Sequence, residues 1–149
     1  GILMPEPLPI KDVLDELDTQ WNASNVAEPK FIEVTGATND PLRFNLNVGD
    51  VVFGRAGDPA LEETPIGNWT YGNRVYNISI EVYTRVNRQR LYDLVKEIRR
   101  VCHARMHSLT SFQRIQFEGF TESTQEQVNI WTGAITIKLE NNAILLETT

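Results

Sequence analysis

The stretch VYNISIEVYTRVNRQRLYDLVKEIRRVCHARMH, residues 75–107, joins the clearest strand pattern of the chain to its clearest helix pattern. In residues 75–86 apolar and polar side chains alternate, which predicts a strand of an antiparallel sheet with one buried and one solvent-exposed face. The face expected to be buried holds Tyr76, Ile78, Ile80, Val82, Thr84 and Val86. Asn87 is a suitable N-cap, and residues 88–107 carry apolar side chains at helical spacing. The stretch therefore predicts a central strand followed by a long helix that packs on its sheet.

The flanking segments complete this pattern. Prolines make residues 1–9 an extended N-terminal arm, and apolar side chains from Val13 to Trp21 recur at the spacing of a short helix. Strand-like runs follow at 31–35 and 49–54, and two more at 112–120 and 128–140 are expected to form a hairpin. Residues 1–149 thus read as one α+β domain. We expect a mostly antiparallel sheet of about four to five strands, with the long helix packed on one face and the shorter helix at the N-terminus.

Residues 56–74 have no clear period and contain three glycines and two prolines, so they predict a long loop. The loop holds Trp69 and Tyr71, two large aromatic residues in polar surroundings. They either fold back over the core or act as anchors of an interface, because Trp and Tyr contribute strongly to association. Both interpretations remain open on the sequence alone.

Composition excludes several classes of protein. The chain has 149 residues, 41% of them hydrophobic, and no run of about 20 apolar residues that would predict a membrane-spanning helix. Its one cysteine, Cys102, cannot form an internal disulfide and is expected to pack in the core, which suits reducing surroundings. Residues 1–8 do not resemble a secretory signal.

Charge is unevenly distributed along the chain. The formal net charge is −6, but residues 85–114 hold eight basic and two acidic side chains. Such a basic strip on an acidic body favours docking of one subunit on the acidic face of the next; a solvated surface and a nucleic-acid site are the alternatives. The basic candidates for this contact are Arg85, Arg88, Arg90, Arg99 and Arg100. Glu62 and Glu63 are either ordinary solvated residues or part of the acidic counterpart.

The sequence contains little that points to catalysis, a metal or a cofactor. His103 and His107 are four residues apart, as two zinc ligands can be, but no HExxH pattern accompanies them. Cys102 and His103 are adjacent on a predicted helix and therefore point in different directions. Without a catalytic motif, we expect a protein that is not an enzyme and has no cofactor.

In its order of elements and local motifs, the chain resembles the tail-terminator and tail-completion proteins of tailed viruses, also called head–tail joining proteins. The resemblance covers most of the chain as a pattern of architecture, with no single diagnostic motif. The matching pieces are Trp21-Asn22, Pro29-Lys30, Gly49-Asp50-Val51-Val52, Glu81-Val82-Tyr83-Thr84-Arg85, Arg88-Gln89-Arg90-Leu91-Tyr92, Glu97-Ile98-Arg99-Arg100-Val101 and Ile130-Trp131-Thr132-Gly133.

The resemblance implies a structural virion protein, assembled in the host cytoplasm, that forms a ring, typically a hexamer, at the head-proximal end of the tail tube. Such a ring ends tube polymerisation and contacts the tube protein and the neck or connector. DNA passes through its lumen without specific binding, and an acidic wall would repel phosphates. A neck or head-completion protein of the same virion and a cellular module that binds a ligand or peptide are the alternatives.

Overall fold

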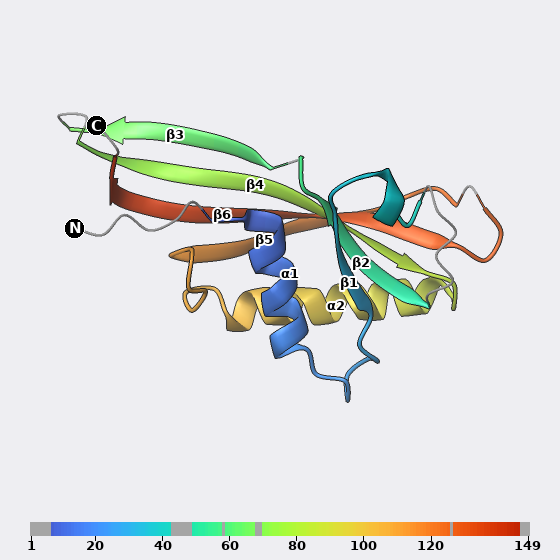
Figure 1. Cartoon of the computed structure of the whole chain (residues 1–149). Coiled ribbons are helices and arrows are strands. Elements are labelled where there is room, and N and C mark those ends of the chain that lie inside the picture. The colour runs from blue at the N-terminus through green and yellow to red at the C-terminus, as the bar shows by residue number, and fades with distance from the viewer. Residues whose placement is uncertain (1–6, 43–48, 58, 68–69, 126, 147–149) are drawn as a thin grey trace.

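The computed structural model describes residues 7–42, 49–57, 59–67, 70–125 and 127–146 (Figure 1). Trp69 and the first six residues of the expected N-terminal arm lie outside these ranges. The elements, in chain order, are α1 (Pro9–Gln20), β1 (Lys30–Val34), the short 3₁₀ helix η1 (Ala37–Asn39), β2 (Asp50–Arg55), β3 (Ala60–Ile66), β4 (Tyr71–Thr84), α2 (Arg88–Ala104), β5 (Arg114–Glu122) and β6 (Trp131–Leu145). The predicted α+β class, with a mostly antiparallel sheet, a long helix and a shorter N-terminal one, is confirmed.

The sheet has six strands in the order β1-β2-β4-β6-β5, with β3 paired to the first half of β4. The β1–β2 pair is parallel, and all other pairs are antiparallel. The expected C-terminal hairpin is present, because β5 pairs with β6, although β6 continues beyond the predicted end at residue 140 to Leu145. Figure 1 shows both helices on the same side of the sheet.

The main core lies between this sheet and the helices. The inward face of β4 carries Tyr76, Ile78, Ile80 and Val82 as predicted, and α2 covers them with Leu91, Leu94, Ile98 and Val101. Cys102 is buried in the same core, as expected. Val86, expected on the buried face, lies beyond the end of β4 and is 56% exposed. The alternation of β4 therefore holds only within the strand itself.

The opposite face of the sheet is not uniformly exposed to solvent, which corrects the sequence prediction. Tyr83 is buried there with Val34, Val51 and Phe53 in a second, smaller cluster. A sequence pattern that assumes one buried face cannot reveal this cluster, because β1 and β2 supply it from a distant part of the chain.

Residues 56–74 are not one long loop, as the sequence predicts. They contain β3, which pairs with β4 from Ala60↔Asn77 to Ile66↔Tyr71, and β4 itself begins at Tyr71. All seven residues of β3 are exposed, so the strand buries no apolar face and lacks the alternation by which strands are recognised. We call β3 and its partner segments, 71–77 of β4 and 138–145 of β6, the arm. The arm projects past the helices in Figure 1.

Candidate interaction surfaces

Three of the predicted arginines lie together where β4 ends and α2 begins. Asn87 caps α2 by accepting a hydrogen bond from the backbone N–H of Arg90 at 2.7 Å. The Arg90 Nε donates to Asp50 of β2 at 2.8 Å, and that carboxylate also accepts from the Thr84 hydroxyl at 2.6 Å. The Arg85 Nε donates to the Tyr83 hydroxyl at 2.6 Å. These contacts fix the corner between strand and helix.

Arg88, the first residue of α2, is paired with Glu122 at the end of β5. Its Nε and Nη2 donate to the two oxygens of Glu122 at 2.8 and 2.9 Å, and the Tyr92 hydroxyl donates to the same carboxylate at 2.6 Å. These hydrogen bonds raise the pKa of Arg88 and lower that of Glu122. Arg88 is still 67% exposed, so the pair can meet a partner without being rearranged.

Arg100 has a structural role within the subunit. Its Nε and Nη2 each donate to Glu97 at 2.7 Å, and Nη2 also donates to the Gln20 carbonyl at 2.9 Å. The Asn22 backbone N–H and the Asn25 side chain donate to Glu97 at 2.8 Å each, which ties the segment after α1 to α2. Burial favours the neutral form of Glu97, but the hydrogen bonds from Arg100, Asn25 and Asn22 outweigh it and lower its pKa to about 2.

Glu97 is a buried member of this network and is not among the site residues that the sequence predicts. The residue is 2% exposed. Its spacing holds a signal, because position 97 follows Leu94 by three residues and precedes Val101 by four, and both neighbours are buried. A charged residue at a core position of an amphipathic helix predicts a partner of opposite charge, here Arg100, whose own side chain is 42% exposed.

Among the five candidate arginines, Arg99 is the one for which the described residues supply no partner. It is exposed on α2 and makes no hydrogen bond or ion pair within the described ranges. It lies eleven residues after Arg88, roughly 16 Å along the helix axis. The five candidate arginines are therefore divided into a corner of three with partners, Arg100 in the network of the buried Glu97, and Arg99.

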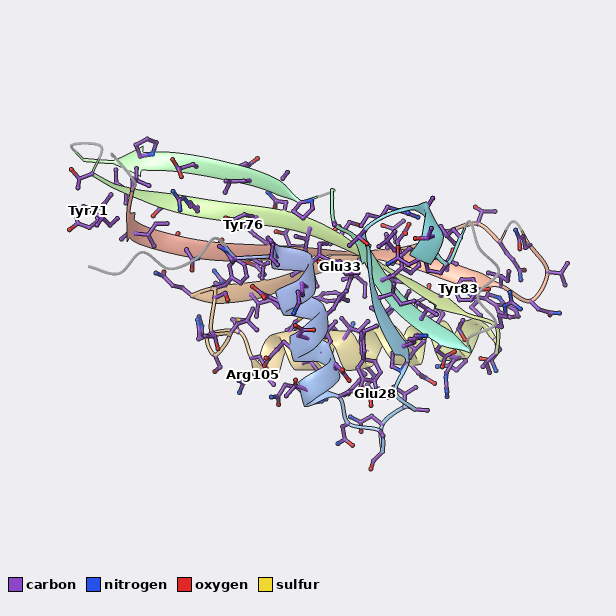
Figure 2. The ribbon with its side chains drawn as sticks, in the orientation of Figure 1. Glu28, Glu33, Tyr71, Tyr76, Tyr83 and Arg105 are labelled. Carbon is purple, nitrogen blue, oxygen red and sulfur yellow. The ribbon has the colours of Figure 1, made fainter. Side chains whose placement is uncertain are left out.

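Of the remaining candidates, Glu62, Glu63 and Tyr71 lie on the arm, away from the candidate arginines. Glu62 is exposed on β3, and Glu63 accepts a hydrogen bond from the Arg74 Nε at 2.5 Å. Tyr71 is 51% exposed at the start of β4, and Figure 2 places it at the opposite end of the strand from Tyr83. The nine candidate residues thus do not form one site: those that are described occupy the arm and α2 with its preceding turn.

The arm ends in an apolar surface that sequence reasoning missed. Ile66, Tyr71 and Leu145 are register partners on three adjacent strands, and they are 42%, 51% and 59% exposed. Directly opposed residues in antiparallel strands project from the same face, so these three side chains form one group, which we call the arm-tip cluster. Its parts are separated by up to 79 positions in the sequence, so only strand register could reveal it.

A second group of exposed apolar residues lies at the other end of the sheet. Val86 follows β4, Tyr92 is in the second turn of α2, and Val128 precedes β6; they are 56%, 40% and 86% exposed. Thr84 pairs with Trp131, which places the end of β4 beside the start of β6. Tyr92 contacts Phe120 of β5 edge to face, at 5.5 Å between ring centroids, so the start of α2 lies against the neighbouring part of the sheet. We call Val86, Tyr92 and Val128 the helix-end cluster.

Two small pockets lie among the described residues. One pocket of about 160 Å³ lies between α1 and the segment after α2 and is lined by Asp12, Asp15, Glu16, Thr19 and residues 109–111. Arg105 donates to Glu16 beside it at 2.6 Å; Figure 2 labels Arg105 near α1. A second, of about 250 Å³, lies over the Arg55–Asp40 ion pair. Sites for small organic molecules are usually larger and mainly apolar.

Across the described ranges, no group of three or more His, Cys, Asp or Glu side chains is arranged to hold a metal ion. No helix in that part of the chain is both long and apolar enough to cross a membrane. His103 and His107 are exposed, and burial raises the pKa of the Cys102 thiol to about 12.

Comparison with known proteins gives a likeness of structure. No protein-family model matches the chain, and no curated protein matches it by sequence. Among solved structures, 28 chains match. One belongs to the virion of a native gene transfer agent (GTA) particle; the match has a TM-score of 0.62 and covers 89% of this chain and 94% of that chain. The two chains share a fold. At 11% sequence identity, the likeness lies in the arrangement of elements.

Proposed function

We propose that this chain is a structural virion protein that forms a ring at the head-proximal end of a viral tail tube, ends tube polymerisation and joins the tail to the neck. The observation that carries the proposal is the similarity of fold to a GTA virion chain over almost the full length of both. It agrees with the resemblance to tail-terminator proteins. Fold alone does not determine function, so the surfaces must be compatible with such a role.

The surfaces support assembly better than catalysis. Ring formation by identical subunits needs two different patches on each copy, and this chain has exposed groups at both ends of a long sheet. Within the ring, we propose that Tyr71, Glu62 and Glu63 on one side and Arg85, Arg88, Arg90 and Arg99 on the other take part in contacts between subunits. The tail tube protein and the neck or connector protein are the other proposed partners. A net charge of −6 suits a lumen through which DNA slides without binding.

A neck or head-completion protein of the same virion is the second candidate. The same similarity of fold to a GTA virion chain supports it, because a shared fold does not determine a position within the particle. The two candidates differ in what the ring contacts. A terminator binds the end of a tail tube, whereas a neck protein binds other components of the connector.

The first test is the solution mass by light scattering over a range of protein concentrations, with negative-stain images of the same sample. We expect rings of about six subunits. A heterologous contact between identical subunits produces a closed ring when the rotation from one subunit to the next adds up to a full turn. The second is to add the protein to polymerising tail tube protein of the same particle, where it should cap one end and shorten the tubes.

Antibodies against this chain, applied to purified particles, locate the protein independently of assembly in solution. Labelling at the junction of head and tail is expected. Labelling there without capping of tubes would favour the neck protein. Particles that carry no copy of the chain would overturn the virion proposal.

A further inference from the structure

The arm-tip cluster is held in a defined geometry. A bulge lies in β6, because β4 advances two residues from Gly72 to Arg74 while β6 covers three, from Ile144 to Asn141. Ala143 in this bulge has φ of +53°, a conformation that costs energy for a residue with a Cβ. Its backbone N–H donates to the Asn73 side chain at 2.8 Å, and the Leu146 N–H donates to the Thr70 carbonyl at 2.8 Å. The bulge thereby sets the direction of Leu145.

This geometry favours a contact made by side chains. Bulges redirect side chains and commonly lie next to functional surfaces, and strain is retained where the surroundings hold it in place. Addition of a further strand to the free edge of β3 is disfavoured, because Glu62, Glu63 and Pro65 lie on that strand and such residues protect exposed edges. An apolar tip of fixed shape loses little entropy when a partner covers it.

The helix-end cluster offers a complementary surface on the same chain. Strand β4 has 14 residues, so its two ends are roughly 45 Å apart, with Tyr71 at one and Val86 just beyond the other. On β3, Glu63 is paired with Arg74, whereas Glu62 is exposed and has no partner among the described residues. At the other end, Arg88 is paired with Glu122 but remains 67% exposed. One end of the molecule therefore combines an apolar group with an exposed carboxylate, and the other combines an apolar group with an exposed guanidinium.

We propose that the arm-tip cluster of one copy docks on the helix-end cluster of a second copy of this chain. Both halves of the contact are present on one subunit, which is what a repeating heterologous interface requires. A stable interface buries about 800 Å² on each partner, more than three side chains expose, so the exposed face of β3 belongs to the contact as well. The inference rests on the proposed function in assuming assembly of identical subunits, and it names the surfaces that meet.

The test traps the contact with cysteines added to the full chain. Tyr71→Cys and Val128→Cys variants are mixed in equal amounts under mild oxidation. Cys102 is buried and its thiol remains protonated, so it supplies no competing thiolate. We expect the disulfide between the two different variants in about tenfold excess over the two like-with-like disulfides combined, because a heterologous contact joins different patches.

The matched control pairs Tyr71→Cys with Leu42→Cys, whose site is 53% exposed but lies at neither end. That pair should give the mixture expected from random encounters. A random mixture from the Tyr71→Cys and Val128→Cys pair would overturn the inference. If negative-stain images show rings while the cross-linking is random, the proposed function stands and only the assigned contact is wrong. If the cross-linking is preferential but virions contain no copy of the chain, the contact stands and the proposed function is overturned.

Discussion

Glu97 combines burial with charge, and its network gives the fold a dependence on pH. The folded-state pKa of about 2 lies below the ordinary value of 4.5, so the carboxylate stabilises the fold above pH 4.5 and loses that contribution as pH falls towards 2. The full shift is worth at most about 3 kcal/mol. We predict that Glu97→Gln lowers stability at pH 7 and that its difference from the native chain shrinks between pH 4.5 and 2. Urea unfolding at several pH values measures this difference; a constant difference would contradict the assignment.

The two adjacent arginines of α2 provide a matched pair of substitutions. Arg100→Ala leaves the buried Glu97 carboxylate without its cation and should cost about 2 kcal/mol, since the two asparagines still donate to it. Arg99→Ala removes an exposed side chain and should change stability by less than about 0.5 kcal/mol. Unfolding free energies of both variants test this, and equal effects would refute the division of roles. For the same reason, a charge reversal meant to probe assembly belongs at Arg99, because Arg100→Glu would disturb the fold itself.

At the scale of elements, close packing between β6 and β5 depends on one glycine. A Cβ at Gly133 would overlap the Phe120 ring and approach the Thr121 carbonyl oxygen to 2.8 Å. Gly133→Ala should therefore cost about 1 to 3 kcal/mol, because the strands must separate to admit the methyl group. Gly119→Ala on β5 is the control, since nothing lies within 4 Å of its Cβ position. Thermal unfolding of the two variants should differ clearly, and similar melting temperatures would show that the strands accommodate the methyl group.

How well each element could be predicted from the sequence follows from what it buries. Strand β4 and helix α2 each bury one face on the core, so the periodicity of their apolar residues predicts both elements. Strand β3 buries neither face and is held by pairing with β4, which no local pattern of apolar residues records. The same limit applies to the interaction surfaces. Individual residues such as Tyr71 could be named from composition, but their grouping with Ile66 and Leu145 depends on register between distant strands.

At the scale of the whole molecule, charge along the sequence is a poor guide to charge on the surface. Residues 85–114 have a strong positive excess, yet ion pairs join Arg88 to Glu122, Arg90 to Asp50 and Arg105 to Glu16. Folding thus brings acidic side chains from β2, β5 and α1 against the basic strip. We therefore expect partner recognition to depend more on the two ends of the sheet, where exposed apolar residues accompany charge, than on the total positive charge of one helix.

A heterologous contact between these ends predicts a specific result when two defective copies are mixed. Tyr71→Asp places a charge in the arm-tip cluster, and Val128→Asp places one in the helix-end cluster; each variant alone should fail to form rings, since every contact in a ring uses both clusters. In the mixture, the intact arm tip of Val128→Asp can still bind the intact helix end of Tyr71→Asp, and the chain of contacts stops there. Light scattering should therefore report a 1:1 dimer in the mixture. Mixtures that stay monomeric at concentrations where the native chain forms rings would refute the pairing of these two surfaces.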